Sequence, residues 1–526
     1  MFFFFAALVI TITLILILER FAKPATKRPF SYNISVLSAM PTLVFYTTIF
    51  MISYRPLFSA LATLVVFTGI IVVNNAKVAI LREPLVFTDF ALLRQAIRYP
   101  ALYIKYVGVG KVVAVVTAGL AAIFSAVSLE KAVIVRNDFD DYFPLIIYLA
   151  VVCGMIFAIT RGPFRRTFAD TLRRFGPTAN VTQDRDKLPL VVCLIFYFFL
   201  ANEPEHKQQP ARRRLERRVA LRRRPVLDMP RGDVVVVQSE SFFDARRLHE
   251  SIPRDLLTTF DACAAESSYQ GRLSVPAWGA NTMRTEFAFL SGLPSEALGY
   301  HQFNPYLTLC QSPVWTVAHL FRSMGYRTIC LHPFHGSFFD RKTVIPNLGF
   351  DLLLDLADFA DAPTFGPYVS DTAVADRIVS LLEADHPRPL FIFAITMENH
   401  GKWEKGRLDD QPADPAIGEA PLGSPDLGLY LRHLRNTDAL VERLWRYLKS
   451  RPQDGTFCLF GDHLPPLAKV FDAVAQTDPR TDYFIWRKNA GQRRALDTSA
   501  DILGRLVLDA ALSSLRAEAA PPEQEA

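Results

Sequence analysis

Glu240, Asp462 and His463 are residues whose types and places could bind a divalent cation. Glu240 closes the run "DVVVVQSE", and the Asp–His pair closes "TFCLFGDH". A carboxylate so close to four valines should be exposed, paired or bound to a metal, because burying an unpaired charge is costly. Carboxylate oxygens and an imidazole form a common ligand set for such a cation. An Asp that caps a helix beside a surface His is the alternative explanation of the pair.

Thr282, in "GANTMRTEF", is the candidate nucleophile. A hydroxyl is a weak nucleophile at its ordinary pKa, and coordination to a metal is one way to activate it. The small residues before it permit a tight turn, and the residues after it have helical apolar spacing. A phosphate at such a helix start would meet free N–H groups and the positive end of the dipole. We therefore expect Thr282 to attack a phosphorus atom while bound to the metal, and a simple Thr N-cap is the alternative.

From Asp233 onward, short β-branched runs alternate with helical patterns. Buried strands that alternate with helices predict a mostly parallel sheet covered on both faces. Ligands of such folds gather beyond the carboxyl ends of the strands. Four strand-like runs end in polar residues, so we expect one shared pocket. These residues are Glu240, His332 with His335, Glu398 with His400, and Asp462 with His463.

Residues 1–201 hold nearly all the long apolar runs and predict an α-helical membrane domain of about six spans. The expected spans are Met1–Leu18, Val36–Tyr54, Leu57–Val73, Val112–Leu129, Phe143–Thr160 and Leu188–Ala201. No basic residue precedes the first run and no A-x-A site follows it, which favours a retained anchor over a signal peptide. The last run has only 14 residues, so a buried or interfacial helix is its alternative.

Lys and Arg in the short loops favour a cytoplasmic first loop, and likewise cytoplasmic loops at 74–111 and 161–187. With six spans the chain starts outside the cytoplasm and returns there, whereas five spans would leave the C-terminal part inside. Residues 202–230 are then an Arg-rich linker or an amphipathic helix on anionic headgroups. Residues 231–514 form the extracytoplasmic catalytic domain, and 515–526 a disordered tail. The net charge of +6 is modest and favours a membrane surface over nucleic acid.

The motifs "SES", "GANTMRTEF", "HPFHGSFFDR", "TMENHG" and "FGDH" occur in this order. Together they resemble the lipoteichoic acid synthase and phosphoglycerol transferase group of the alkaline phosphatase/sulfatase superfamily. The resemblance covers about 233–483 and implies one divalent cation, Mn²⁺ or Mg²⁺ in the first place and Zn²⁺ in the second. It implies that the cation is held by Glu240, Thr282, Asp462 and His463, with Thr282 as the nucleophile.

The resemblance also suggests substrate contacts. His400 matches a histidine that contacts the transferred phosphate group, and Arg341 with Phe339 matches a segment that contacts the glycerol headgroup. Phe339 stands where the group has Trp, and the His-to-Arg stretch differs in length. We further assign His400 and His335 to catalysis, where either could protonate a leaving oxygen or stabilise the charge. The remaining residues assigned to substrate binding are Asp340, His332 and Arg284.

The implied activity moves phosphoglycerol from a phospholipid, with phosphatidylglycerol as the favoured donor, to a glycan or glycerol phosphate acceptor. It would proceed through a phosphoglycerol-threonine intermediate at the outer face of a bacterial cytoplasmic membrane. A phosphoethanolamine transferase, a phosphodiesterase and a non-catalytic membrane scaffold are the alternatives. The lack of a C-x-P-x-R motif argues against a sulfatase activity.

Overall fold

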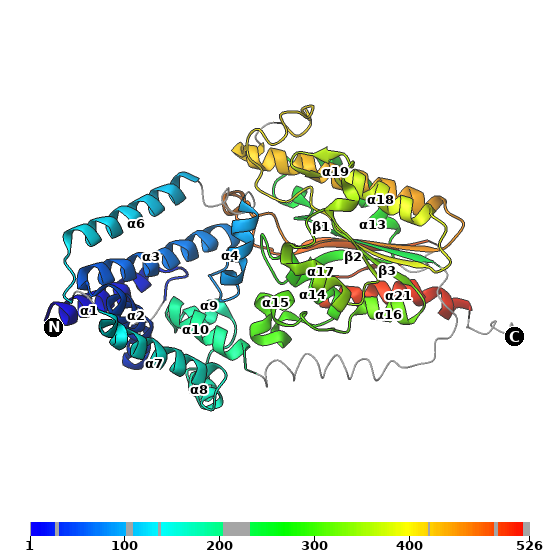
Figure 1. Cartoon of the computed structure of the whole chain (residues 1–526). Coiled ribbons are helices and arrows are strands. Elements are labelled where there is room, and N and C mark those ends of the chain that lie inside the picture. The colour runs from blue at the N-terminus through cyan, green and yellow to red at the C-terminus, as the bar shows by residue number, and fades with distance from the viewer. Residues whose placement is uncertain are drawn as a thin grey trace. The chain divides into compact units, whose positions relative to one another are not determined.

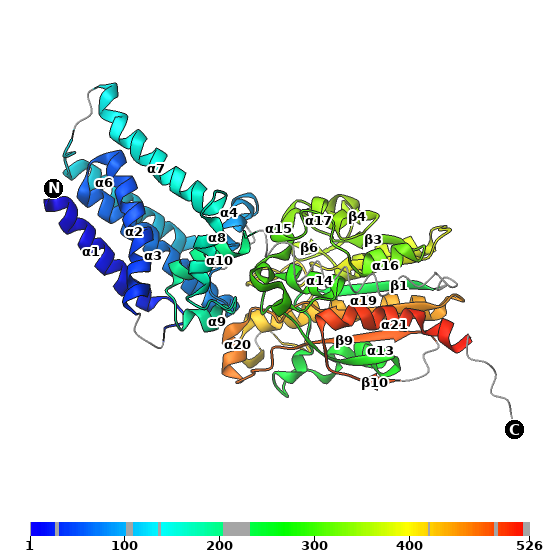
Figure 2. The same cartoon turned by 90° about the horizontal axis from the view of Figure 1, so that it is seen from below.

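The computed structural model describes residues 2–26, 31–100, 109–134, 138–203, 232–418, 421–488 and 493–518. The chain divides into two units, Met1–Lys207 and Gln208–Ala526, which are drawn in Figures 1 and 2. Most of the predicted Arg-rich segment 202–230 lies outside the described residues. The predicted tail 515–526 begins inside the last helix, which continues to Glu518, and its remaining residues are not described.

The first unit is α-helical, as its apolar composition predicts. Its helices are α1 (Phe2–Leu18), α2 (Tyr32–Ser53), α3 (Pro56–Leu81), α4 (Asp89–Arg98), α6 (Val109–Leu129), α7 (Phe143–Thr160), α8 (Arg165–Arg173), α9 (Val181–Arg185) and α10 (Leu190–Ala201). Within the described part of the chain, four segments are long and apolar enough to cross a membrane. These are Phe2–Phe21, Tyr32–Ser53, Pro56–Leu81 and Asp140–Thr160. The fourth predicted span falls in α6, whose side chains are only partly described.

Helix α10 corresponds to the sixth predicted span. Its 12 residues extend for about 18 Å, well short of the roughly 30 Å hydrocarbon core. The Glu19 carboxylate accepts hydrogen bonds from Leu190 N at 2.9 Å and Val191 N at 3.1 Å, which caps the start of α10. Just beyond its end, Glu203 pairs with Arg173 at the end of α8. Helices α4, α8, α9 and α10 gather at one end of the long helices (Figures 1 and 2). The length and contacts of α10 favour the alternative of a buried helix, and the six-span count stays a prediction.

The second unit is an α/β domain, and its strands are β1 (Asp233–Ser239), β2 (Tyr269–Ser274), β3 (Arg327–Leu331), β4 (Leu352–Leu354), β5 (Thr364–Phe365), β6 (Tyr368–Val369), β7 (Leu390–Ile395), β8 (Gly455–Gly461), β9 (Thr481–Arg487), β10 (Arg494–Ala495) and β11 (Thr498–Ser499). Its helices are α13 (Thr258–Glu266), α14 (Thr282–Ser291), α15 (Pro305–Thr308), α16 (Val317–Ser323), α17 (Arg341–Asn347), α18 (Asp371–Glu383), α19 (Pro425–Ser450), α20 (Ala468–Ala473) and α21 (Ala500–Glu518). The main sheet has the order β10-β2-β9-β8-β1-β7-β3-β4.

Strands β8, β1, β7, β3 and β4 are parallel, and β9 and β2 add an antiparallel edge. The valines of β1 alternate between the two faces of the sheet. Val235 and Val237 pack in one core with α13, α18 and α19, and Val234 and Val236 in the other with α14, α16 and α21. Helices therefore cover both faces of the sheet (Figures 1 and 2). The mostly parallel α/β fold predicted from the sequence is confirmed.

The register of the central strands explains why distant motifs meet. Strand β1 pairs with β8 from Asp233 opposite Gly455 to Ser239 opposite Gly461. The next residue of each strand, Glu240 and Asp462, therefore starts its loop at the same edge of the sheet. Strands β7 and β3 run in the same direction beside β1 and end at this edge too. All four predicted strands thus end where the sequence expects a pocket.

Candidate active site

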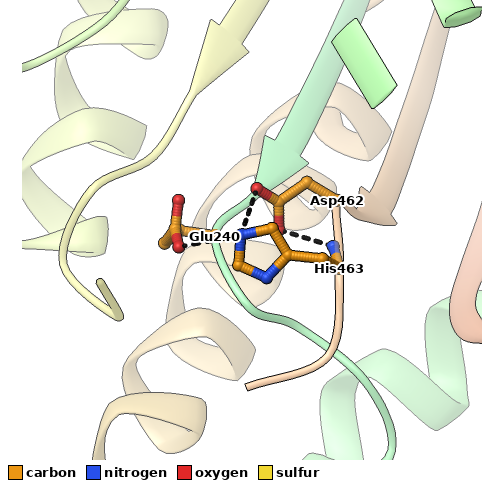
Figure 3. Close-up of side chains that lie close together, drawn as sticks. All are labelled: Glu240, Asp462 and His463. Carbon is orange, nitrogen blue, oxygen red and sulfur yellow. Dashed lines mark hydrogen bonds and ion pairs between the residues drawn. The ribbon is translucent and has the colours of Figure 1, made fainter. Parts of the chain in front are cut away.

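Glu240, Asp462 and His463 lie together beyond the ends of β1 and β8 (Figure 3). Each offers one ligand atom, and these atoms lie within 4.8 Å of one another. The Nε2 atom of His463 is 3.4 Å from both Glu240 Oε1 and Asp462 Oδ2. All three side chains are buried. The arrangement supplies two carboxylates and one imidazole around a single point.

The two loops are also bonded directly to each other. The backbone N–H groups of Ser241 and His463 both donate to Asp462 Oδ1 at 2.8 Å. Ser241 has a φ of 54°, a left-handed conformation that costs free energy in a residue other than glycine. Tyr430 holds this residue by donating to its carbonyl at 2.8 Å. The loop that carries Glu240 is therefore fixed against the loop that carries Asp462.

Gly461 allows this close approach. A Cβ atom at this position would lie 1.8 Å from the carbonyl oxygen of Phe242. We expect Gly461→Ala to separate the loops and to lower the free energy of unfolding of the second unit by at least about 1–3 kcal/mol. Thermal and denaturant unfolding of the full-length protein measure this loss. The control is Gly154→Ala, whose Cβ would meet nothing within 4 Å, and equal stability of the two variants would contradict the prediction.

Two observations indicate that the cluster fits a cation. His463 Nδ1 lies 2.9 Å from the carbonyl of Leu464, and a carbonyl only accepts, so Nδ1 carries the proton and Nε2 keeps its lone pair toward the carboxylates. Asp462 Oδ2 is buried without a hydrogen-bond partner among the described residues. A buried polar atom normally has a partner. A divalent cation among these atoms would give both His463 Nε2 and Asp462 Oδ2 a partner.

The electrostatics of the cluster also favour a bound cation. Burial raises the pKa of Glu240, and burial followed by the Glu240 charge raises the pKa of Asp462 to about 7. Burial lowers the pKa of His463, but the two carboxylates outweigh it and leave that pKa above its ordinary value. Two buried like charges at this distance destabilise each other. A bound cation would stabilise both in their ionised form.

Thr282 begins α14, as the sequence predicts, and its hydroxyl faces the cluster. Its Oγ1 donates to Glu240 Oε2 at 3.4 Å. Asn281 before it has a φ of 66°, and its side chain does not cap the helix. The first N–H groups of α14 thus lie beside the nucleophile, where a phosphate would be favoured. Thr285, one turn on, donates to the carbonyl of Asp462 at 2.7 Å and ties α14 to the cation site.

Arg341 lies in a buried polar unit with residues that the sequence analysis did not single out. Its Nη2 atom pairs with Glu286 Oε1, and Tyr306 donates to Glu286 Oε2 at 2.6 Å. The Nε and Nη1 atoms of Arg341 are buried without a partner in the described chain. Glu286 is one helical turn after Thr282, a spacing that could have indicated a common face. The Glu286 charge also raises the pKa of Glu240, so this unit adjoins the cluster.

His332 offers an acceptor near Arg341. Its Nδ1 lies 3.2 Å from the carbonyl of Ile395 and therefore carries the proton. The Nε2 atom is buried and has no partner among residues with described positions. Burial, and next the charge of Arg341, holds the pKa of His332 well below its usual range. The neutral ring thus keeps an acceptor lone pair in the neighbourhood of the unpaired Arg341 donors.

His400 follows β7 and lies beside the cluster. Its Nδ1 lies 2.8 Å from the carbonyl of Gly401, which leaves Nε2 as the acceptor. Burial is the largest cause that lowers the pKa of His400 to about 4, and the nearby His463 contributes to this shift. The ring is therefore neutral near pH 7, and Nε2 carries a lone pair.

The remaining predicted site residues make contacts outside the cation cluster. Asp340 is exposed, and its carboxylate accepts from Thr343 Oγ1 at 3.0 Å in a surface turn. His335 is exposed, and its ring packs 5.2 Å from that of Phe334. Arg284 points from α14 to the carbonyl of Phe303, which it contacts at 3.0 Å. None of these three contacts joins its residue to the cation cluster. Phe339, in contrast, packs under Arg341, with 5.5 Å between the guanidinium carbon and the ring centre.

Comparison with known proteins identifies the class. Residues 232–511 match the Sulfatase family, which is more than half of the 526-residue chain. The chain therefore belongs to the sulfatase family. Beside this domain the described chain carries four apolar segments long enough to cross a membrane. The resemblance to the alkaline phosphatase/sulfatase superfamily is confirmed.

The chain is similar to two named proteins and to one solved structure. The chain is 29% identical over 483 residues to the capsular polysaccharide biosynthesis protein RkpI of Rhizobium meliloti (strain 1021), covering 89% of this chain and 86% of that protein. A second protein of that organism, whose description names cyclic beta-1,2-glucan modification, is 28% identical over 304 residues, or 53% of this chain and 46% of that protein. The Streptococcus pyogenes phosphoglycerol transferase GacH, solved in complex with sn-glycerol-1-phosphate, matches at 23% identity with a TM-score of 0.45, over 61% of this chain and 88% of that one.

Proposed function

We propose that this protein is a metal-dependent transferase that moves phosphoglycerol from a phospholipid to a glycan through a covalent intermediate on Thr282. The observation that carries the proposal is the position of the Thr282 hydroxyl, 3.4 Å from Glu240 Oε2 beside the Asp462–His463 pair. The cation, Mn²⁺ or Mg²⁺, would be held by Glu240, Thr282, Asp462 and His463. When bound, it would supply Lewis-acid stabilisation of negative charge on the phosphoryl oxygens.

In the first half-reaction, Thr282 Oγ attacks the phosphorus of the lipid phosphodiester. The Oγ–P bond forms as Oγ gives up its proton, the bond from phosphorus to the diacylglycerol oxygen breaks, and that oxygen takes up the proton that Thr282 released. The phosphate lies at the start of α14, where backbone N–H groups and the helix dipole favour its charge. The products are diacylglycerol and phosphoglycerol-threonine.

In the second half-reaction, an acceptor hydroxyl attacks the same phosphorus and the Oγ–P bond breaks. The orientation of His400 supports a role as the base that takes the acceptor proton, because Nδ1 is turned to the Gly401 carbonyl and Nε2 has the lone pair. The attacking oxygen becomes the new phosphodiester oxygen. Thr282 regains its proton and the cycle can repeat.

The groups around Arg341 support glycerol over ethanolamine as the headgroup. A hydroxyl can accept from the unpaired Arg341 donors and donate to His332 Nε2. An ammonium group can only donate, and the charge of Arg341 would repel it. Phosphatidylglycerol is therefore the proposed donor and phosphatidylethanolamine the second candidate.

The relatives support a glycan acceptor. RkpI is named for capsular polysaccharide biosynthesis, and the second relative is described by glucan modification. We therefore place the second unit on the outer side of a bacterial inner membrane, where envelope glycans are found. If α10 does not cross and five helices do, this placement requires a cytoplasmic N-terminus, contrary to the loop charges.

The group left on Thr282 is the direct test. The full-length protein is incubated with Mn²⁺ and vesicles of phosphatidylglycerol and phosphatidylethanolamine, then quenched in acid and digested. We expect mass spectrometry to find glycerol phosphate on the peptide that contains Thr282. A nitrogen-containing adduct would instead identify a phosphoethanolamine transferase. A phosphorylated residue elsewhere, with none on Thr282, would refute the proposed nucleophile.

A further inference from the structure

Glu398 is a buried carboxylate at the end of β7 that does not join the cation cluster. Its Oε1 atom accepts from His433 Nδ1 and from Asn436 Nδ2, both at 2.8 Å. Its Oε2 atom accepts from the backbone N–H of Asp371 at 2.7 Å. Three donors satisfy the carboxylate without a cation. Its place next to the site therefore needs another explanation.

His433, on α19, connects Glu398 to Arg407 through hydrogen bonds. The Nε–H group of Arg407 donates to His433 Nε2 at 3.0 Å. A guanidinium only donates, so His433 Nε2 must be the acceptor and Nδ1 must carry the proton that is donated to Glu398. His433 is completely buried, and burial holds its pKa well below its ordinary value. The ring is thus a neutral link in a single tautomer.

Arg407 donates hydrogen bonds to the backbone on both sides of His400. Its Nη2 donates to the carbonyl of Glu398 and its Nη1 to the carbonyl of Lys402, each at 2.9 Å. Its guanidinium lies over the ring of Tyr368, 5.6 Å from the centroid. The edge of the same tyrosine ring packs 5.8 Å from the ring of His400. The two backbone bonds of Arg407 and the packing of Tyr368 thus converge on the segment that carries His400.

We propose that Glu398, His433 and Arg407 are positioning residues that aim His400 Nε2 at the acceptor oxygen in the second half-reaction. The inference rests on the proposed function. His400 is bonded to Gly401 within its own segment, so the direction of its free nitrogen follows the backbone that Arg407 fixes. A shift of about 1 Å in a reacting group can cost roughly 100-fold in rate. The carboxylate, imidazole and guanidinium act through His400 and do not touch substrate.

Arg407→Lys tests the proposal in the full-length enzyme. Lysine keeps the charge but cannot reach two carbonyls and His433 at once. We expect the steady-state rate to fall roughly 100-fold, while the first half-reaction continues. The variant should therefore release one equivalent of diacylglycerol in a burst and accumulate phosphoglycerol on Thr282. If burst and turnover fall in parallel and no adduct accumulates, the proposal is overturned.

Arg432→Lys is the matched control. Arg432 neighbours His433 on α19, but its guanidinium donates to the Pro412 carbonyl at 2.7 Å, away from the segment that carries His400. We expect it to keep the wild-type rate without a stable adduct.

A pair of variants at His433 gives a second measurement should Arg407→Lys fold poorly. His433→Gln retains a donor and an acceptor and should preserve turnover, whereas His433→Leu should accumulate the adduct. Equal kinetics of these two variants would also refute the role of His433 in connecting Glu398 to Arg407.

A chromogenic diester separates this inference from the proposed function. Bis(4-nitrophenyl) phosphate with Mn²⁺ reports attack by Thr282 through a burst of nitrophenolate and needs no lipid. If wild type gives this burst but releases no diacylglycerol from vesicles, the lipid donor is wrong. The positioning of His400 is then judged on whether Arg407→Lys prolongs the adduct from the chromogenic diester. Unchanged adduct lifetimes would overturn it.

Discussion

Thr282→Ala is expected to abolish release of diacylglycerol from labelled phosphatidylglycerol, with a loss of at least about a thousandfold. The variant removes the protein atom that the proposed mechanism bonds to phosphorus, while the proposed cation ligands Glu240, Asp462 and His463 remain. The protein should still fold and reach the membrane, because Thr285 continues to tie α14 to the Asp462 carbonyl. Release from membranes with equal amounts of each variant is the measurement.

Two further variants sharpen this test. Thr282→Ser keeps a hydroxyl and should retain measurable turnover. Thr258→Ala removes an exposed hydroxyl that donates within its own helix start at 2.9 Å, and it should match wild type. Wild-type release by Thr282→Ala would remove this residue as the nucleophile, even if the cation site were correct.

Asp462→Asn is expected to weaken cation binding by more than about 100-fold, since loss of a neighbouring hydrogen bond alone costs 10–100-fold. The amide oxygen can still accept from Ser241 N and His463 N, which now bond to Oδ1 at 2.8 Å. Its NH₂ group would replace Oδ2 and point donors at the cation. Turnover should fall with the loss of bound metal, which is measured by elemental analysis and by activity over a range of Mn²⁺ concentrations.

Stability distinguishes lost binding from a damaged fold. Removing one of two crowded, buried carboxylates should leave the metal-free variant at least as stable as wild type. Exhaustive chelation should stop the wild-type enzyme, and Mn²⁺ or Mg²⁺ should restore it. Asp376→Asn, in an exposed ion pair with Arg443, is the control and should change neither property. Full activity of the chelated enzyme would exclude the role of the metal.

The arrangement of Glu240, Asp462 and His463 could be predicted because parallel strands end at one edge of a sheet. Apolar runs identify the strands, and the polar residue after each run then has a fixed place. The register of β1 and β8 makes this placement tight, since Ser239 lies opposite Gly461. The sequence thus predicted both the α/β fold and the juxtaposition of the three proposed cation ligands.

Other residues depended on the course of a loop. Glu398 follows β7 as Glu240 follows β1, yet its carboxylate is directed to His433 on α19. No periodicity in the sequence reveals this direction, because it depends on three donors from two other helices, α18 and α19. His335 and Asp340 likewise belong to a promising motif but lie exposed. The short α10 was ambiguous for a different reason, since an apolar run of 14 residues suits either a core or a bilayer.

The bond from Ser241 N to Asp462 Oδ1 joins residues 221 positions apart, and it has a consequence for biosynthesis. A nascent chain emerges from its N-terminus, so the membrane helices and β1 are complete long before β8 leaves the ribosome. Until then, Glu240 and Thr282 have no Asp462–His463 partner. A product terminated before β8 would lack Asp462 and His463, and the proposed transfer could begin only after nearly the whole polypeptide had been translated.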